Sequence, residues 1–231
     1  MKINILSPIF KGKLTQKLNN KVSKSFRYNI IIDNTRETID SIIILGNGNV
    51  DDIAIPIVCH HLNSSKIVGL IKPDGRKRTE TISGFSTYVS GTEIDKIALV
   101  MDQEGENLYE IYERIEHKLM NQNIRFEIIM ENNRVKQYRC WYGSKPFDFI
   151  LIISGLDDIT TQSHKIEDHL INGALKLSRI SKTNLLQDSK DTWNSIDAPL
   201  QKEILNYFVN NRGPSSEVFP QHFIGLQLLE G

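Results

Sequence analysis

Acidic residues follow several of the apolar stretches in this sequence, close to the point where each stretch ends. They are Asp51 and Asp52, Asp102 and Glu104, Asp157 and Asp158, and, in a helical stretch further on, Glu167 and Asp168. A carboxylate cluster suits a hard cation such as Mg²⁺, because oxygen ligands match its charge and leave coordination positions for water and a phosphate group. Two such ions can stabilise the attacking and leaving oxygens of a phosphoryl transfer. The acids are therefore candidates for metal-assisted chemistry on phosphates.

Each acid taken alone also has a simpler interpretation. Carboxylates are favoured in the first turn of a helix, where they cap free N–H groups and meet the positive end of the helix dipole. This interpretation suits Asp51, Asp52 and Glu106. It suits Asp102 less well, because Asp102 directly ends an apolar stretch, where a lone charge is costly unless a ligand or a donor meets it. Asp102, with Glu104 two residues on, is therefore the strongest candidate for a metal ligand.

The elements that must position these acids are predicted by the hydrophobic pattern. Stretches rich in isoleucine and valine predict strands at Tyr28 to Ile32, Ser41 to Leu45, Lys66 to Ile71, Lys96 to Met101, Arg125 to Met130 and Phe147 to Ser154. Amphipathic stretches predict helices at Asp51 to Leu62, Glu106 to Asn121, Ser163 to Leu177 and Ala198 to Val209. This alternation predicts an α/β fold with a mainly parallel sheet flanked by helices, a Rossmann-like core.

The acids are expected to converge in such a fold. In an open parallel sheet the carboxyl ends of the strands meet the amino ends of the following helices at one edge, and ligands bind there. We therefore expect Asp51, Asp102, Asp157 and Glu167 to lie at the same edge of the sheet.

Two of the strand ends carry short motifs that resemble those of a known family. The segment IIILGNGNVDD contains Asn47, Gly48 and Asp51, and the segment IALVMDQE ends in Asp102 and Glu104. They resemble Toprim domains, found in topoisomerases, DnaG-type primases, OLD-family nucleases and small Toprim-like proteins. In that family one strand ends in Glu-Gly with an Asp three residues on, and a later strand ends in Asp-x-Asp. Asn47 stands at the position of the family's glutamate.

The resemblance covers residues 41 to 177 and implies a function. It implies a Toprim-like core that binds Mg²⁺ through Asp102 and Glu104, with Asp51 as an outer carboxylate, and that acts on nucleic acid or nucleotide phosphates. The segment HKIEDHLI is similar to a helix of the smaller Toprim-like proteins, and its acids Glu167 and Asp168 are candidates to supply a missing charge.

The departure at Asn47 leaves the function open. An amide neither gains nor loses a proton and is a weaker ligand than a carboxylate, so Asn47 cannot do the acid–base work of the family's glutamate. One hypothesis is an enzyme of Mg²⁺-dependent phosphodiester chemistry that uses another acid. The alternative is a catalytically degenerate domain that binds nucleic acid or a protein partner. A structural α/β protein unrelated to Toprim is a third interpretation.

Basic residues gather in two segments, although the 28 basic and 28 acidic residues balance overall. Residues 1 to 32 contain seven lysines and arginines and no acid. The segment KPDGRKR carries Lys72, Arg76, Lys77 and Arg78 around an expected turn, directly after a predicted strand. Both segments are either solvated surface or contacts for the phosphates of nucleic acid.

Other features exclude several classes of protein. The loop after the predicted strand Ser41 to Leu45 lacks the third small residue of a dinucleotide-binding motif, and no GxxxxGK[ST] motif occurs. Two cysteines, Cys59 and Cys140, are too few for a disulfide scaffold or a multi-cysteine zinc site. No signal-peptide core and no stretch long enough to span a membrane is present, which predicts a cytoplasmic protein.

The chain is expected to fold around one main core. We predict a basic N-terminal extension at 1–38, a Toprim-like core at 39–180, and a final part at 181–231. That part is predicted to comprise a polar linker at 181–194, a helix, a loop at 211–216 and a tail packed on the core. The sequence leaves the oligomeric state open.

Overall fold

The computed structural model describes residues 1–5, 32–33, 39–46, 50–72, 78–91, 93–159, 161 and 163–231 of the chain. Within these residues the strands form one eight-stranded sheet. Their order is β2 (Ile32–Asp33), β1 (Lys2–Ile5), β4 (Ile67–Ile71), β3 (Ser41–Ile44), β5 (Lys96–Asp102), β8 (Lys145–Ser154), β7 (Val135–Tyr142) and β6 (Ile124–Asn132). All pairings from β2 to β8 are parallel, and those of β7 are antiparallel. The predicted α/β fold with a mainly parallel sheet is confirmed.

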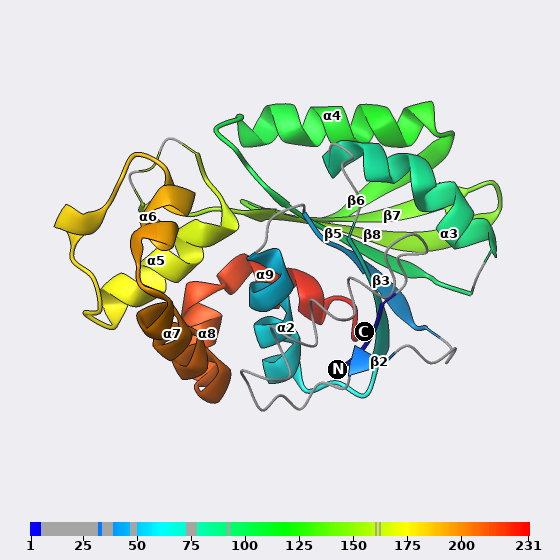
Figure 1. The fold of residues 1–231 in the computed structure, drawn as a ribbon. Helices are drawn as coiled ribbons and strands as arrows, with labels where there is room; N and C mark the ends of the chain where they lie inside the picture. Colours follow the sequence, from blue (N-terminus) through cyan, green and yellow to red (C-terminus); the bar gives the residue numbers. More distant parts are fainter. Residues whose placement is uncertain are drawn as a thin grey trace.

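Helices cover both faces of the sheet (Figure 1). On one face lie the 3-10 helix η2 (Arg78–Gly84), α3 (Phe85–Gly91) and α4 (Leu108–Asn121); α2 (Asp51–Leu62) and α9 (Pro220–Gln227) lie on the other. The central strands β3, β5 and β8 are buried at almost every position, because each of their faces meets a helix layer. Alternate residues of each strand therefore enter two separate hydrophobic cores.

The other helices of the C-terminal part gather beyond the end of β8 (Figure 1). They are α5 (Ile166–Lys176), the 3-10 helix η3 (Lys182–Asn184), α6 (Ser189–Ser195), α7 (Ala198–Asn210) and α8 (Arg212–Val218). α5 packs on α6, α7 and α8, and α2 packs on α7, α8 and α9. These contacts join the C-terminal helices to the core on the side of the sheet where α2 lies.

Helix capping explains where the helices begin. α2 has the predicted limits and keeps Pro56 inside. α4 begins two residues later than predicted, because the Asn107 side chain accepts a hydrogen bond from the Tyr109 N–H at 2.9 Å. α7 begins at the predicted residue, with the Asp197 side chain accepting from the Leu200 N–H at 2.8 Å. Each cap satisfies an N–H that has no partner within its own helix.

Two segments of the C-terminal part differ from the sequence-based expectation. The expected linker holds η3 and most of α6, whose Trp193 is buried against the core. The expected loop at 211–216 lies largely within α8, where Pro214 occupies the first turn. Proline is tolerated there because the N–H groups of a first turn have no partner within the helix. Polar composition alone did not distinguish these short helices from loops.

The antiparallel part of the sheet was predicted incompletely. β6 was predicted, but β7 and the first residues of β8 were not, because their alternating charged and aromatic residues lack a continuous apolar run. Gly143, with φ +61°, begins the two-residue turn that joins β7 to β8. Of the first predicted strand, Ile32 lies in β2, whereas residues 28–31 lie outside the described residues.

In the part of the chain that the structure describes, no helix is both long and apolar enough to cross a membrane.

Candidate functional site

Three acids from separate segments converge at the carboxyl edge of the sheet. Asp51 is the first residue of α2, which follows β3; Asp102 is the last residue of β5; and Glu167 lies in the first turn of α5, which follows β8. β3, β5 and β8 are neighbours, and Asp102 pairs in register with Ser154, the last residue of β8. Three adjacent strands thus direct one carboxylate each to the same place.

The three carboxylates are buried and act on one another electrostatically. Asp51 is 1 % exposed, Glu167 4 % and Asp102 9 %. Burial raises the pKa of Asp51 well above its ordinary value, and the negative charges of Asp102 and Glu167 raise it further. Burial, followed by the charge of Asp102, raises the pKa of Glu167 to about 7. The surroundings of the cluster therefore favour the protonated, neutral forms of Asp51 and Glu167.

Hydrogen bonds satisfy only part of the cluster. The Asp102 Oδ1 accepts from the N–H of Ile166, the first residue of α5, at 2.8 Å. The Asp51 Oδ2 is buried and has no hydrogen-bond partner among the described residues. A Cβ on Gly46 would lie 2.9 Å from this oxygen, so the absence of a side chain there allows the carboxylate to approach the backbone. The Oδ2 of the neighbouring Asp52 is likewise buried without a hydrogen-bond partner among the described residues, and Asp51 carries the one of these two oxygens that belongs to the cluster.

Lys72, one of the predicted phosphate contacts, pairs with an acid of α2. Its Nζ lies 2.8 Å from the Oδ1 of the buried Asp52, the neighbour of Asp51. The positive charge of Lys72 also lowers the pKa of Asp51, although burial and the acids outweigh it. Of the other predicted phosphate contacts, Arg76 and Lys77 lie outside the described residues, and of Arg78 only the backbone, at the start of η2, is described.

Asp168 is adjacent to Glu167 but accepts hydrogen bonds from the loop after β8 and from the start of α5. It is fully buried, and its carboxylate accepts from the N–H of Lys165 at 3.3 Å, the N–H of Leu156 at 3.2 Å and the Oγ1 of Thr161 at 3.2 Å. These bonds cap α5 and fasten the loop between β8 and α5. Of the two acids predicted as substitutes for the missing charge, the structure brings only Glu167 to Asp102 and Asp51.

The structure describes two of the three remaining predicted positions. Glu104 stands in a turn with φ +56°, its side chain exposed, and its N–H donates to the His164 carbonyl at 3.1 Å. Asp157 follows β8 as predicted, but its carboxylate pairs with Arg134 at 2.5 Å and that interaction lowers its pKa against the effect of burial. Asn47 lies outside the described residues.

A buried histidine network supports the loop after β8. The His169 Nδ1 lies 2.5 Å from the Val218 carbonyl, which fixes Nε2 as the acceptor of the Gly155 N–H at 3.2 Å and of the Gln221 Nε2 at 2.9 Å. Burial lowers the pKa of His169 to about 4, so the ring is neutral at physiological pH. His169 therefore joins α5 to α8 and α9.

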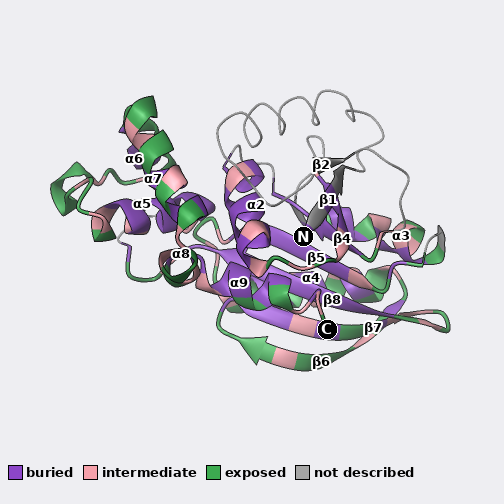
Figure 2. Ribbon diagram, turned by 90° about the horizontal axis from the view of Figure 1, so that it is seen from below, coloured by how far each residue is buried: buried purple, intermediate pink, exposed green. Residues whose placement is uncertain are grey.

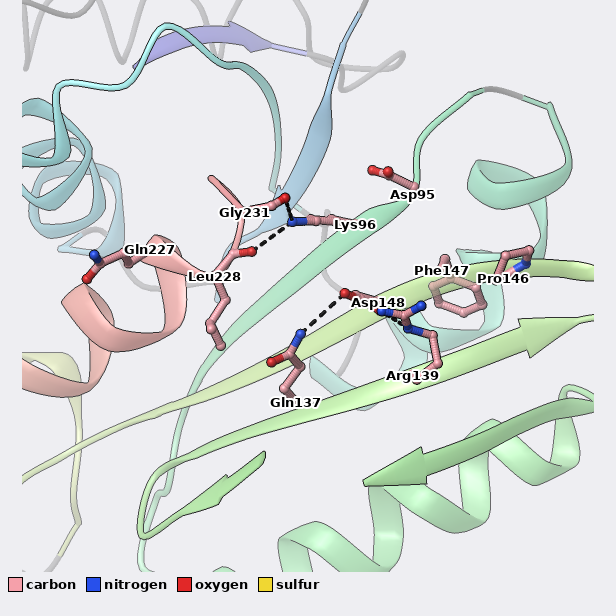
Figure 3. A pocket seen from close by; sticks show the side chains of 10 residues that line it. All are labelled: Asp95, Lys96, Gln137, Arg139, Pro146, Phe147, Asp148, Gln227, Leu228 and Gly231. Carbon is pink, nitrogen blue, oxygen red and sulfur yellow. Dashed lines mark hydrogen bonds and ion pairs between the residues drawn. The ribbon is translucent and has the colours of Figure 1, made fainter. Parts of the chain in front are cut away.

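A cavity of about 520 Å³ lies at the amino-terminal end of β5, beside β7, β8 and the C-terminal segment (Figure 3). Several of its polar side chains bind one another or the C-terminal segment: Lys96 donates to the carbonyls of Leu228 at 3.1 Å and Gly231 at 2.6 Å, and Asp148 pairs with Arg139 at 2.5 Å. No sequence motif predicted this cavity, and its paired groups offer no reactive centre.

In their present rotamers, the described side chains include no group of three or more His, Cys, Asp or Glu residues that could hold a metal ion. Binding a cation at the cluster would therefore require rotation of at least one carboxylate.

Neither the models of known protein families, nor the curated proteins, nor the solved structures give a match to this chain.

Proposed function

We propose that this chain binds a divalent cation such as Mg²⁺ through Asp51, Asp102 and Glu167, and that the site acts on the phosphates of nucleic acid or a nucleotide. The observation that carries the proposal is the convergence of three buried carboxylates, from three segments, at the carboxyl edge of a parallel sheet. Buried like charges are costly to ionise, and a cation at the cluster would offset that cost.

The residues present fit such an ion in kind. All three are oxygen ligands, and the Asp51 Oδ2 is a buried acceptor without a hydrogen-bond partner among the described residues. A divalent cation would supply charge stabilisation for a phosphate oxygen. Glu167 supplies the carboxylate that Asn47 does not, while Lys72 holds Asp52 and leaves Asp51 to the cluster. Weak binding is expected, because Asp102 already accepts from the Ile166 N–H.

A binding domain without chemistry is the second candidate. It is favoured by Asn47 at the position of the family's glutamate and by Glu104, which is exposed in a turn and not buried beside Asp102. Under this alternative the chain would bind nucleic acid or a nucleotide at the same edge without cleaving it.

An assay for cleavage of single- and double-stranded nucleic acid with Mg²⁺ or Mn²⁺ distinguishes the enzyme from the binding domain without chemistry. If the site is catalytic but lacks an acid–base group, Asn47→Glu should raise the rate by about 10²- to 10⁴-fold, and adding Asp102→Asn should remove the gain. Asp158→Asn, an exposed acid in the neighbouring loop, is the matched control and should change nothing. Nucleic acid binding without cleavage in any variant would leave the binding domain standing. No binding and no cleavage would contradict both.

A further inference from the structure

β6 forms one edge of the sheet, and no described strand pairs with its outer side. Figure 2 shows it at the border of the sheet, largely exposed. The side chains of Ile128 and Ile129 are 47 % and 51 % exposed. The strand contains neither proline nor lysine, the residues that commonly protect an edge from pairing with another chain. An open edge with exposed isoleucines is suited to accept a further strand.

The first five residues of β6 are complementary to themselves. They read Ile-Arg-Phe-Glu-Ile, from Ile124 to Ile128, with opposite charges placed symmetrically about Phe126. If a second copy pairs antiparallel about a two-fold axis at Phe126, Arg125 of each copy stands opposite Glu127 of the other. The same register places Ile124 opposite Ile128 of the second copy. Residues directly opposite in an antiparallel pair share a face and interact.

The two charged residues are available for this pairing. Within the described residues, neither Arg125 nor Glu127 forms an ion pair. Glu127 stands opposite Arg139 of β7, but Arg139 is paired with Asp148. Both residues are exposed.

A bulge limits the pairing to this segment. The register of β6 with β7 shifts between Ile128 and Met130, so side chains beyond Ile128 change face. Phe126 packs toward the core under α4, whereas Met130 packs toward the core under α9. The regular part of the edge therefore ends where the charge symmetry ends.

A shallow cavity of about 790 Å³ lies beside the same segment. It is lined by Met120, Asn123, Ile124, Arg125, Phe126 and Gly143. Because the proposed register brings Ile128 of the second copy opposite Ile124, that isoleucine would enter the cavity next to the exposed Met120. Burial of exposed isoleucine surface would stabilise the pair at roughly 25 cal/mol per Å².

We propose that two copies of this chain associate through β6, antiparallel about Phe126, and form one continuous sheet. Arg125 and Glu127 set the register, and the exposed Ile128 and Met120 supply the apolar contact. The proposal does not depend on the carboxylate cluster, which lies at the strand ends.

Charge reversal tests this interface, with sedimentation velocity and light scattering as the measurements. The unaltered chain is expected at twice its 26.5 kDa mass. Arg125→Glu places acid against acid twice, and Glu127→Arg places base against base twice, so each should weaken association at least about tenfold. The double variant should restore it. An equimolar mixture of the two single variants should form a mixed dimer, because each then carries the charges that the other needs. Lys202→Glu, on the exposed face of α7, is the control.

Three results would overturn the proposal. They are a single-chain mass at every concentration up to about 1 mM, a dimer that neither reversal weakens, and single variants that stay apart when mixed. Circular dichroism on each variant checks that the fold is intact, which is expected since both residues are exposed.

Discussion

At the scale of residues, two adjacent acids in the first turn of α5 have different roles. Glu167 meets Asp102 and Asp51, and its pKa is raised to about 7 by burial and by the charge of Asp102. Asp168 accepts hydrogen bonds from the loop and from the helix start. The sequence indicated both as substitutes for the acid missing at Asn47, because it shows that they share a helix turn but not which side each one faces.

The raised pKa of Glu167 predicts a pH dependence of stability. The folded state keeps a proton that the unfolded chain loses near pH 4.5, so this contribution is complete below about pH 4.5 and is lost as the pH rises through about 7. The Glu167→Gln variant is neutral at this position throughout. At pH 8 it should therefore unfold at a higher temperature than the unaltered protein, with a free energy of unfolding that is higher by at most about 3 kcal/mol. The difference should shrink towards pH 5. Thermal unfolding at several pH values between 5 and 8 measures this. A difference in unfolding temperature between the two proteins that stays constant over this pH range would contradict the prediction.

Asp168→Ala is predicted to act on stability and not on the site. Loss of the cap and of the loop contacts should lower the free energy of unfolding by about 2 to 3 kcal/mol, because the part-buried N–H groups of Leu156 and Lys165 lose their acceptor. Denaturant unfolding measures the loss, and cation binding by the folded variant should persist. Loss of binding without loss of stability would move Asp168 into the site.

At the scale of elements, close packing places the C-terminal helices. A Cβ on Gly225 of α9 would lie 2.4 Å from the Cγ1 of Ile152 in β8, so the helix touches the sheet only because this residue is glycine. The sequence predicted the central strands and α2 well, because long apolar runs and strong periodicity dominate there. It predicted a tail packed on the core but not that this tail forms the helix α9, since nothing local marks Gly225 as a contact with Ile152, 73 positions away.

Gly225→Ala should therefore destabilise the fold by about 1 to 3 kcal/mol through overpacking. Adding Ile152→Ala removes the clashing atoms, so the double variant should lose less stability than the sum of the two single losses. Urea unfolding of the three variants provides the comparison. Additive losses would show that α9 does not press on β8 as described.

At the scale of the whole molecule, the carboxylates lie at the carboxyl ends of the central strands, whereas β6 is an outermost strand of the sheet. The parallel order that brings Asp51, Asp102 and Glu167 together follows from alternating strands and helices, so the sequence predicted this convergence. It did not predict that Lys72 pairs with Asp52, because that contact depends on β4 lying beside β3.

The basic segment after β4 belongs to the proposed nucleic acid function. If it contacts phosphates, affinity for nucleic acid should fall steeply with salt, and Arg76→Ala, Lys77→Ala and Arg78→Ala together should reduce the slope of log affinity against log salt by about 2 to 3. The exposed basic residues Lys182, Lys202 and Arg212 changed to alanine serve as the control. Equal slopes in fluorescence anisotropy titrations would leave the segment as solvated surface.

Isothermal titration calorimetry of the purified protein with Mn²⁺ at pH 8 tests the central claim most directly. We expect one weak site at millimolar ion or below, lost in Asp102→Asn, weakened at least about tenfold in Glu167→Gln, and unchanged in Asp158→Asn. Binding should also weaken as the pH falls through about 7, because protons then compete for Glu167. No heat of binding at millimolar Mn²⁺, or binding that survives Asp102→Asn, would contradict the account.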